Sequence, residues 1–424
     1  MTLILSGTDG LSDVDGTAAT PAIRGTDTNT GIFFPAADTI AFSEGGTEVA
    51  RLDSSGNLLV GTTSASTPGT GFISVANTFG FKNRIINGGM VIDQRNAGAS
   101  VSFAASNSGY TVDRMQLSNV TDGAWTAQRS TTTATGFTNS LLLTVTTADA
   151  SLGATQFASV QQLIEGFNVA DLGWGTANAQ TVTLSFWVRC SLTGTFGGAF
   201  VNSAQNRSYP FTYTINSANT FEYKTVTVAG DTSGTWLTDN GIGIRVYFSL
   251  GTGSTLSGTA GAWSGSTFVS PTGAVSVVGT NGATFYITGV QLEKGSTATS
   301  FDYRPYGTEL MLCQRYAQVI RSNASSTTGL ANLACISSTR AYGEVLLAMQ
   351  MRSAPTISFS AANTFSTRDD GGSGLTLTAI IASNTNIYSF DLDISVSSGL
   401  GAGNCTSTSM LAGTSGLITI SAEL

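Results

Sequence analysis

Alternation of apolar and polar residues is the feature that most constrains what this chain can fold into. In residues 181–190, TVTLSFWVRC, alternate positions place the following residues on one side of an extended strand: Val182, Leu184, Phe186, Val188 and Cys190. The stretches SLLLTVTT, YPFTYTI, FEYKTVTV, GIRVYFSL and ATFYITGVQLE behave similarly. A period of two belongs to a strand with one buried face and not to a helix. Eight or so such strands predict a β-sandwich or jelly roll.

The composition agrees with an all-β fold class. Hydrophobic residues make up 41% of the 424 residues and charged residues only 10%, while 50 glycines accompany abundant Ser and Thr. Enough apolar surface is present to offset the entropy of the chain, so disorder is not expected. Thr, Val, Ile and aromatic residues suit a pleated sheet, and Gly and Asn permit the turns between strands.

Changes of pattern along the chain predict five segments. A turn-rich arm comes first, then a thin β segment with a Ser/Thr/Gly/Pro connector. The jelly roll follows, and a short helix with Thr308 as its N-cap forms a hinge to a second, smaller β-sandwich. In this order the segments are residues 1–30, 31–81, 82–304, 305–318 and 319–424.

The thin β segment raises a packing problem, because its apolar residues are too few to enclose a core in one chain. Three copies around a common axis would triple them and supply neighbours for open strand edges. We therefore predict an elongated homotrimer with an intertwined β shaft. Its core residues are Ile32, Phe33, Phe34, Ile40, Phe42, Val49, Leu52, Leu58 and Val60.

Charge and residue usage argue against several functions. The net charge is −8 with no block of Lys or Arg, so neither nucleic acid nor an anionic membrane is an expected partner. The chain has no histidine, and its four cysteines (Cys190, Cys313, Cys335 and Cys405) form no CxxC pair, so no metal and no cofactor is expected.

The chain carries little sign of catalysis. Without histidine, activation of a serine or cysteine nucleophile by imidazole is impossible, and no catalytic residue is predicted. A pair of carboxylates for glycoside hydrolysis could still be assembled from residues distant in sequence, so this alternative stays open.

Three tryptophans lie among small polar residues rather than inside strand patterns: Trp125, Trp236 and Trp263. An exposed indole can cover the apolar C–H groups of a sugar while hydroxyls and amides bond its rim, so these residues are candidates for glycan binding. The alternative for each one is a ring that plugs the end of a sandwich. Asp369 and Asp370 form either a solvated turn or an acceptor for sugar hydroxyls.

The first residues, MTLILSGTDG, contain no basic region and no long apolar run, which predicts neither a signal peptide nor a membrane span. We expect folding in a reducing cytoplasm, whereas the low charge is typical of proteins that work outside cells. Release by cell lysis would reconcile the two.

Several long motifs resemble one family of proteins. The segment GIFFPAADTIAFSEGGTEVARLDSSGNLLVGTT is similar to shaft segments of phage tail fibres. The motifs FKNRIINGGMVIDQRNAGASV, YTVDRM, FYITGVQLEKGSTATSFDYRPYGTELMLCQRYAQ and MRSAPTIS resemble successive signatures of a tail-fibre and receptor-binding family of tailed bacteriophages.

The resemblance implies a homotrimeric virion protein, made in the host cytoplasm and displayed on the phage particle. Its N-terminal arm would attach to a baseplate, tail or head protein, and its jelly roll, similar to carbohydrate-binding modules, would bind bacterial surface polysaccharide. Two alternatives remain: a purely structural head fibre, decoration or baseplate-linked protein, and a glycan-cleaving tailspike enzyme. The long regular repeat of a tailspike β-helix is not found.

Overall fold

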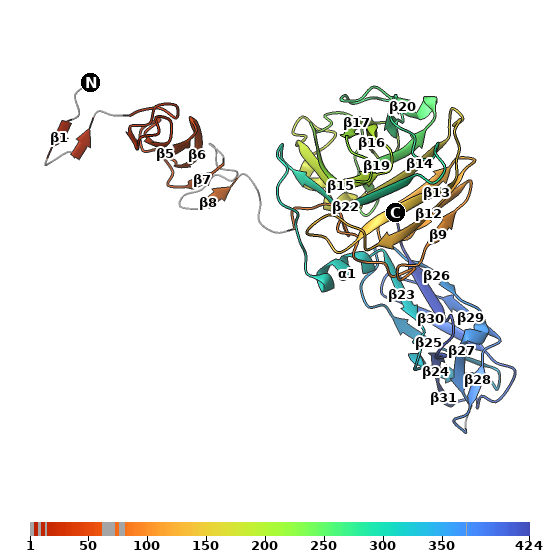
Figure 1. The fold of residues 1–424 in the computed structure, drawn as a ribbon. Coiled ribbons are helices and arrows are strands. Elements are labelled where there is room, and N and C mark those ends of the chain that lie inside the picture. Colours follow the sequence, from red (N-terminus) through yellow and green to blue (C-terminus); the bar gives the residue numbers. More distant parts are fainter. Residues whose placement is uncertain (1–3, 7–9, 13–14, 62–72, 76–80, 370) are drawn as a thin grey trace. The chain divides into compact units, whose positions relative to one another are not determined.

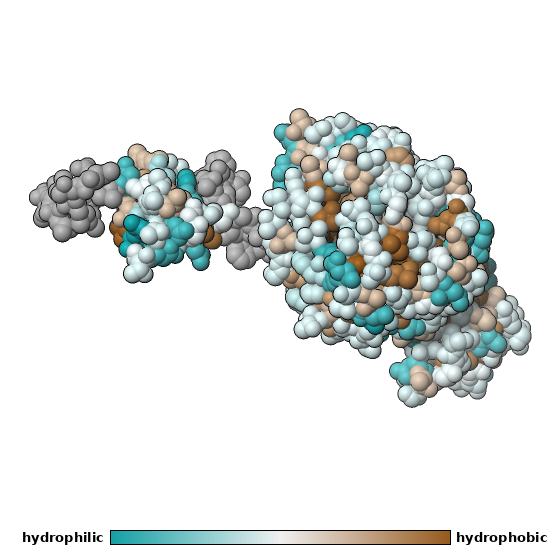
Figure 2. Space-filling model, turned by 45° about the horizontal axis from the view of Figure 1, so that its top comes forward, coloured by the Kyte–Doolittle hydropathy of each residue, from teal (hydrophilic) through white to brown (hydrophobic). Residues whose placement is uncertain are grey.

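The computed structural model describes residues 4–6, 10–12, 15–61, 73–75, 81–369 and 371–424. The chain divides after Gly80 into two compact units. In both, nearly all of the regular secondary structure is strand, which confirms the predicted all-β class (Figure 1). In the described part, no helix is long and apolar enough to cross a membrane. On the face of the second unit that Figure 2 shows, residues of intermediate hydropathy, drawn pale, outnumber the strongly hydrophobic ones.

The first unit holds a hairpin and one six-stranded sheet whose strands follow one another in chain order. Neighbouring strands are antiparallel except β7 and β8, which are parallel. The hairpin is β1 (Ile4–Ser6) and β2 (Gly10–Ser12). The sheet consists of β3 (Ile23–Arg24), β4 (Gly31–Phe33), β5 (Ile40–Glu44), β6 (Thr47–Leu52), β7 (Leu58–Val60) and β8 (Ile73–Val75).

This sheet has two unlike faces. The register pairs Ile32 with Phe42 and Ile40 with Leu52, so these side chains share one face. That face, here called the open face, stays accessible: Ile23 is 47% exposed, and Ile40, Phe42, Leu52 and Val60 are 37–42% exposed. Ile32 and Leu58 also belong to the open face and are half-buried.

The opposite face of the sheet is covered within the same chain. Phe33, Ala41 and Leu59 are buried there. Phe33 therefore does not belong with the exposed apolar residues, which corrects its predicted place in a seam between copies. Phe34 lies beyond the end of β4, and Val49 lies at a β-bulge between β5 and β6.

The strand neighbours that the sequence analysis assigned to other copies come from the chain itself. Each of β4, β5 and β6 has a partner strand on both sides within one polypeptide. The sheet thus pairs its strands within one chain, and the intertwined shaft between copies stays a prediction. The reason is local, because short turns such as Gly45–Gly46, both with positive φ, let each strand fold back on the one before.

Two six-stranded sheets pack face to face in the second unit and form the predicted sandwich (Figure 1). The first sheet contains β10 (Asn107–Tyr110), β11 (Gln116–Val120), β14 (Phe157–Glu165), β19 (Ile242–Thr252), β16 (Gly194–Val201) and β17 (Ser208–Ile215). The second contains β18 (Glu222–Val228), β15 (Val182–Cys190), β22 (Thr284–Lys294), β13 (Ser140–Thr147), β12 (Ala124–Ser130) and β9 (Val101–Phe103).

The alternation read from the sequence builds the core of this sandwich. The five alternate residues of β15, from Val182 to Cys190, are all fully buried and belong to one cluster with Ile244, Val246 and Phe248 of β19. Between the strands lie the short 3₁₀ turns η1 (Gly166–Asn168), η2 (Ala170–Leu172) and η3 (Ser254–Leu256), and the parallel pair β20 (Ser257–Gly258) and β21 (Ser270–Pro271).

Helix α1 (Tyr306–Gln314) leads into a second sandwich with its own core. Its small sheet holds β23 (Ala317–Arg321), β32 (Leu417–Ser421) and β26 (Thr356–Phe359). Its larger sheet holds β28 (Gly374–Thr376), β27 (Phe365–Arg368), β31 (Cys405–Met410), β24 (Thr328–Cys335), β25 (Arg340–Leu346), β30 (Ser389–Ser395) and β29 (Ala379–Ser383). A 3₁₀ turn, η4 (Ala362–Thr364), precedes β27.

The helix begins three residues earlier than the sequence suggested. Pro305 is the N-cap, and Thr308 is the third residue of the helix. Pro305 has an extended ψ of 141° and lies just outside the helix, where its missing N–H removes no helical hydrogen bond. The predicted capping role of Thr308 is therefore wrong.

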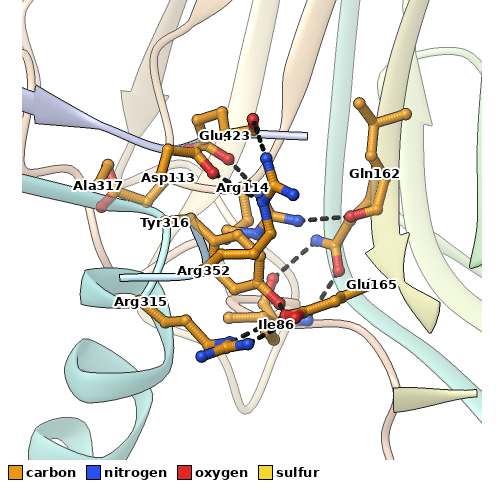
Figure 3. Close-up of polar contacts among 12 residues, drawn as sticks. Ile86, Asp113, Arg114, Gln162, Glu165, Arg315, Tyr316, Ala317, Arg352 and Glu423 are labelled. Carbon is orange, nitrogen blue, oxygen red and sulfur yellow. Dashed lines mark hydrogen bonds and ion pairs between the residues drawn. The ribbon is translucent and has the colours of Figure 1, made fainter. Parts of the chain in front are cut away.

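Buried polar contacts join the two sandwiches at the end of α1. Arg315 and Tyr316 point from the helix toward Glu165 at the end of β14 (Figure 3). The Glu165 carboxylate accepts hydrogen bonds from Arg315 Nε at 2.9 Å and from the Tyr316 hydroxyl at 2.6 Å. On the other side, Arg114 pairs with Glu423 and its guanidinium stacks over the Tyr316 ring. These contacts tie the predicted hinge to both sandwiches.

Candidate functional site

The predicted glycan-binding residues are not brought together as a group. Trp125 lies in strand β12, only 1% exposed, and stacks on Phe103 with ring centroids 4.6 Å apart. Its expected loop setting is therefore wrong, and its ring is core. The small neighbours in GAWT do not mark a loop, because Ala124 and Thr126 alternate with Trp125 across the strand.

Asp369 lies in the second sandwich and is occupied by its own turn. Its carboxylate accepts the backbone N–H of Ser373 at 2.6 Å, and its backbone carbonyl accepts that of Gly372 at 3.0 Å. This is the turn arrangement typical of aspartate. Asp370 lies outside the described residues.

The other two predicted tryptophans meet in one aromatic cluster. Trp236 and Trp263 lie in loops, as expected, with ring centroids 5.4 Å apart. Trp174 contacts both, at 4.8 and 5.3 Å, and all three pairs are edge-to-face. Tyr209 from β17 adds a ring 5.2 Å from Trp263. Such packing stabilises each aromatic pair by about 0.5–1.5 kcal/mol in addition to the free energy gained by burying the apolar surface of the rings.

Each indole N–H of this cluster is bonded to the backbone. Trp174 donates to Gln180 O at 2.8 Å, Trp236 to Ser233 O at 3.2 Å and Trp263 to Ala229 O at 2.8 Å. Trp174 and Trp236 are buried, whereas Trp263 is half-buried. Of the three predicted tryptophans, Trp263 alone keeps part of its ring within reach of a ligand.

An ion pair fixes the loop that carries Trp236. Arg207 binds Asp231 through two hydrogen bonds, both 2.7 Å long, and the hydrogen bonds to Asp231 raise the pKa of the Arg207 guanidinium. Asp231 is buried, and its backbone carbonyl also accepts the N–H of Gly175 next to Trp174. The cluster is thus held from both loops before any ligand arrives.

A cavity of about 250 Å³ opens beside this cluster, here called the edge cavity. It lies between β17 and β18, which are the end strands of the two opposite sheets. Its lining residues are Tyr209, Phe211, Thr212, Val226, Ala260 and Gly261. The last two belong to the loop that carries Trp263, so the ring cluster and the edge cavity form one site.

The chemistry of the edge cavity suits holding a ligand rather than cleaving one. Its walls are aromatic and aliphatic, and none of its lining residues is a carboxylate or an amine. Burial raises the pKa of the Tyr209 hydroxyl, which is therefore a neutral donor and acceptor at physiological pH. An apolar surface with a few hydroxyls is how proteins commonly contact sugars.

Sequence reasoning missed Tyr209 and Trp174. Trp174 follows η2 in the stretch DLGWG, and Gly173 there adopts φ of 61°, a signal of a sharp turn rather than of a ligand contact. Tyr209 lies in the alternating strand YPFTYTI, where it looks like an ordinary core residue. Neither pattern could show that both rings converge on Trp263.

The buried ionic groups between the sandwiches pair with one another. Glu165 and Glu423 each bind arginine partners, and their side chains are 1% and 8% exposed. Surrounding groups include Asp113, Arg315, Tyr316 and Arg352 (Figure 3). Within the described residues, no three of His, Cys, Asp and Glu gather as a metal site.

No protein-family model and no curated protein matches the chain. Solved structures that share some of its fold include the enzymatically active domain of tailspike protein 4 from bacteriophage CBA120, at 14% identity and a TM-score of 0.28. That match covers 54% of this chain and 24% of the tailspike chain.

Carbohydrate-binding modules are also among the similar structures. A CBM4 module matches at 13% identity and a TM-score of 0.26, covering 49% of this chain and 98% of the module. The family 11 module of Clostridium thermocellum, in complex with a mixed-linked tetrasaccharide, matches at 12% identity and 0.21, covering 49% and 96%. The resemblance to phage fibres stays a prediction.

Proposed function

We propose that this protein is a non-enzymatic saccharide-binding protein that works as a multi-copy fibre component on a phage particle. The observation that carries the binding part is the edge cavity, where Tyr209 and Trp263 flank an apolar opening without ionisable groups other than the tyrosine. The C–H face of a sugar ring would lie against the ring of Tyr209. The hydroxyls of the sugar would form hydrogen bonds with the side chain of Thr212 and with the Tyr209 hydroxyl.

Binding at one such cavity is expected to be weak, because the opening is shallow and offers few polar partners. Several copies on one assembly would raise the overall affinity by avidity, roughly 10²–10⁴-fold. The open face of the first unit supports such an assembly. Its exposed apolar residues lie in one sheet, and a second and third copy of this chain would cover them.

The binding proposal is tested with neutral oligosaccharides released from a bacterial envelope, measured by isothermal titration calorimetry on the full chain. We expect Tyr209→Ala and Trp263→Ala to weaken binding at least about tenfold, since a buried aromatic contact with a ligand contributes on the order of 1–3 kcal/mol. Tyr223→Ala, which removes an exposed ring from β18, should leave binding unchanged.

Three results would contradict the proposal. Equal affinity of the wild type and both cavity variants would exclude the edge cavity as the binding site. Release of new reducing ends from the polysaccharide would show a glycan-cleaving enzyme instead of a binding protein. A purely structural role is the outcome if no oligosaccharide from the envelope binds at high protein concentration.

A further inference from the structure

A second cavity in the larger unit, of about 260 Å³, is lined by two arginines and two phenylalanines. The arginines are Arg84 and Arg304, and the phenylalanines are Phe81 and Phe167. We call it the arginine cavity. It shares no lining residue with the edge cavity, so the two are separate sites.

Arg304 keeps an unused donor although its side chain is only 5% exposed. Its Nη1 donates to Ile85 O and to Glu309, both at 3.3 Å, and its Nη2 donates to Asn83 O. Its Nε is buried and has no hydrogen-bond partner among the described residues, since the Asp302 carboxylate is 3.8 Å away. A buried N–H without an acceptor is costly and needs an explanation.

Arg84 repeats this arrangement on the same cavity. Its Nη2 pairs with Asp171 at 2.8 Å and its Nη1 donates to Asn168 O at 3.1 Å. Its Nε is likewise buried without a partner in the described part of the chain. Both arginines that line the cavity therefore carry a buried N–H donor without a partner among the described residues. A guanidinium with an unused donor matches a ligand group that accepts hydrogen bonds and carries negative charge.

The phenylalanines give the same cavity an apolar rim. Phe167 is 60% exposed and Phe81 is 63% exposed, whereas large apolar side chains are usually covered. An exposed ring beside arginines can lie against the C–H groups of a sugar while the guanidinium groups bind its charged substituent. The amino group of Lys294, 3.5 Å from the carbonyl of Asp171, adds positive charge next to Arg84.

We propose that the arginine cavity binds an acidic saccharide, with the sugar carboxylate on Arg84 and Arg304 and the sugar ring against Phe167. The inference rests on the proposed function only in assigning the ligand to the saccharides. The site, the residues and the charge of the ligand all differ from those of the edge cavity.

The test compares two probes, a galacturonic acid oligomer and its methyl ester, in which a neutral ester replaces each carboxylate. Calorimetry on the full chain should show binding of the acid and at least about tenfold weaker binding of the ester, because a hydrogen bond to a charged group contributes on the order of 1.5–3 kcal/mol. Added salt should weaken the binding of the acid but not that of the ester. Acetate should bind far more weakly than the oligomer, because it lacks a ring to contact Phe167.

Four variants locate the site. Arg84→Gln should weaken acid binding at least about tenfold, and Phe167→Ala several-fold. Asp171→Asn should tighten it, because the substitution frees the Arg84 Nη2 that Asp171 now occupies. Tyr388→Ala removes a ring from the second sandwich that is 58% exposed, similar to Phe167. It should leave binding of the acid unchanged.

Equal binding of acid and ester, or full binding by Arg84→Gln, would overturn the proposal. Acetate binding as tight as the oligomer would overturn its saccharide part and leave a small-anion site. Weaker binding by Asp171→Asn would show that the carboxylate, not the arginine, contacts the ligand. Because Tyr209→Ala leaves the arginine cavity intact, failure at one cavity is distinguishable from failure at the other.

Discussion

The sheet of the first unit and the jelly roll of the second use the same alternating sequence pattern with opposite results. In the jelly roll, each sheet turns its apolar face toward the other, and the alternating residues of β15 are fully buried. In the first unit the open face stays 37–47% exposed at five large side chains. The same pattern therefore completes a core in one unit and leaves an exposed apolar face in the other.

The comparison predicts opposite effects for two phenylalanine substitutions. Phe186→Ala in β15 should lower the free energy of unfolding by about 3–5 kcal/mol, because a fully buried ring is lost and a cavity is left. Phe42→Ser should leave the jelly roll equally stable, since Phe42 lies in the other unit and is 37% exposed. It should instead reduce the mass of the assembly. Chemical denaturation and light scattering separate the two effects.

The matched control is Ile381→Ser, which changes an exposed apolar residue of β29. It should change neither the stability of the jelly roll nor the mass of the assembly. A wild-type mass equal to the 43.5 kDa of a single chain at micromolar concentration would contradict the proposed association. An unchanged assembly in Phe42→Ser would remove the open face from it.

The contact between the two sandwiches differs from the open face in kind, because it depends on buried charge rather than on apolar surface. Glu165→Gln should lower the free energy of unfolding by about 3 kcal/mol, since it removes the carboxylate that accepts hydrogen bonds from Arg315 and Tyr316. Arg340→Gln, which breaks the pair with Asp393, should lower it clearly less, because the Arg340 side chain is 54% exposed and water screens that pair.

Differential scanning calorimetry checks both variants. Equal losses would mean that burial at the junction adds nothing to the Glu165 contacts. A second, lower transition in Glu165→Gln would show that the sandwiches unfold separately once this contact is lost.

The strands of the sandwiches were predictable because periodicity is a property of a few neighbouring residues. The alternation in 181–190 became β15 with every apolar position inside. The sites were not predictable in the same way. Trp125 and Trp263 have similar neighbours in GAWT and GAWS, yet one is core and the other borders a cavity. What separates them is the packing of distant strands, which no local pattern records.

The arginine cavity shows the same limit. Arg84 and Arg304 are 220 positions apart in the sequence, and each looks like a surface charge in its own segment. Only the fold brings them to one cavity and leaves their Nε groups without partners among the described residues. Unmatched buried donors are visible in a structure and invisible in a sequence.

The smallest expected effect concerns tyrosine, which also distinguishes the two units. The first unit contains no tyrosine, whereas burial in the second raises the pKa of Tyr110, Tyr209, Tyr213, Tyr247 and Tyr316. Below pH 10, the ordinary pKa of the side chain, these groups are protonated in both states. Above it the unfolded chain loses protons that the folded chain keeps, so the stability of the second unit falls as pH rises.

Tyr213→Phe isolates one of these groups. Its hydroxyl is buried without a hydrogen-bond partner among the described residues, so its removal should be neutral or slightly stabilising at pH 7. At pH 11 the variant should exceed the wild type by about 1.4 kcal/mol more than it does at pH 7, because one linked proton is no longer released on unfolding. Urea unfolding followed by tryptophan fluorescence reports the second unit alone, since all five tryptophans lie there. If variant and wild type differ by the same free energy of unfolding at both pH values, the Tyr213 hydroxyl is not held protonated by the core.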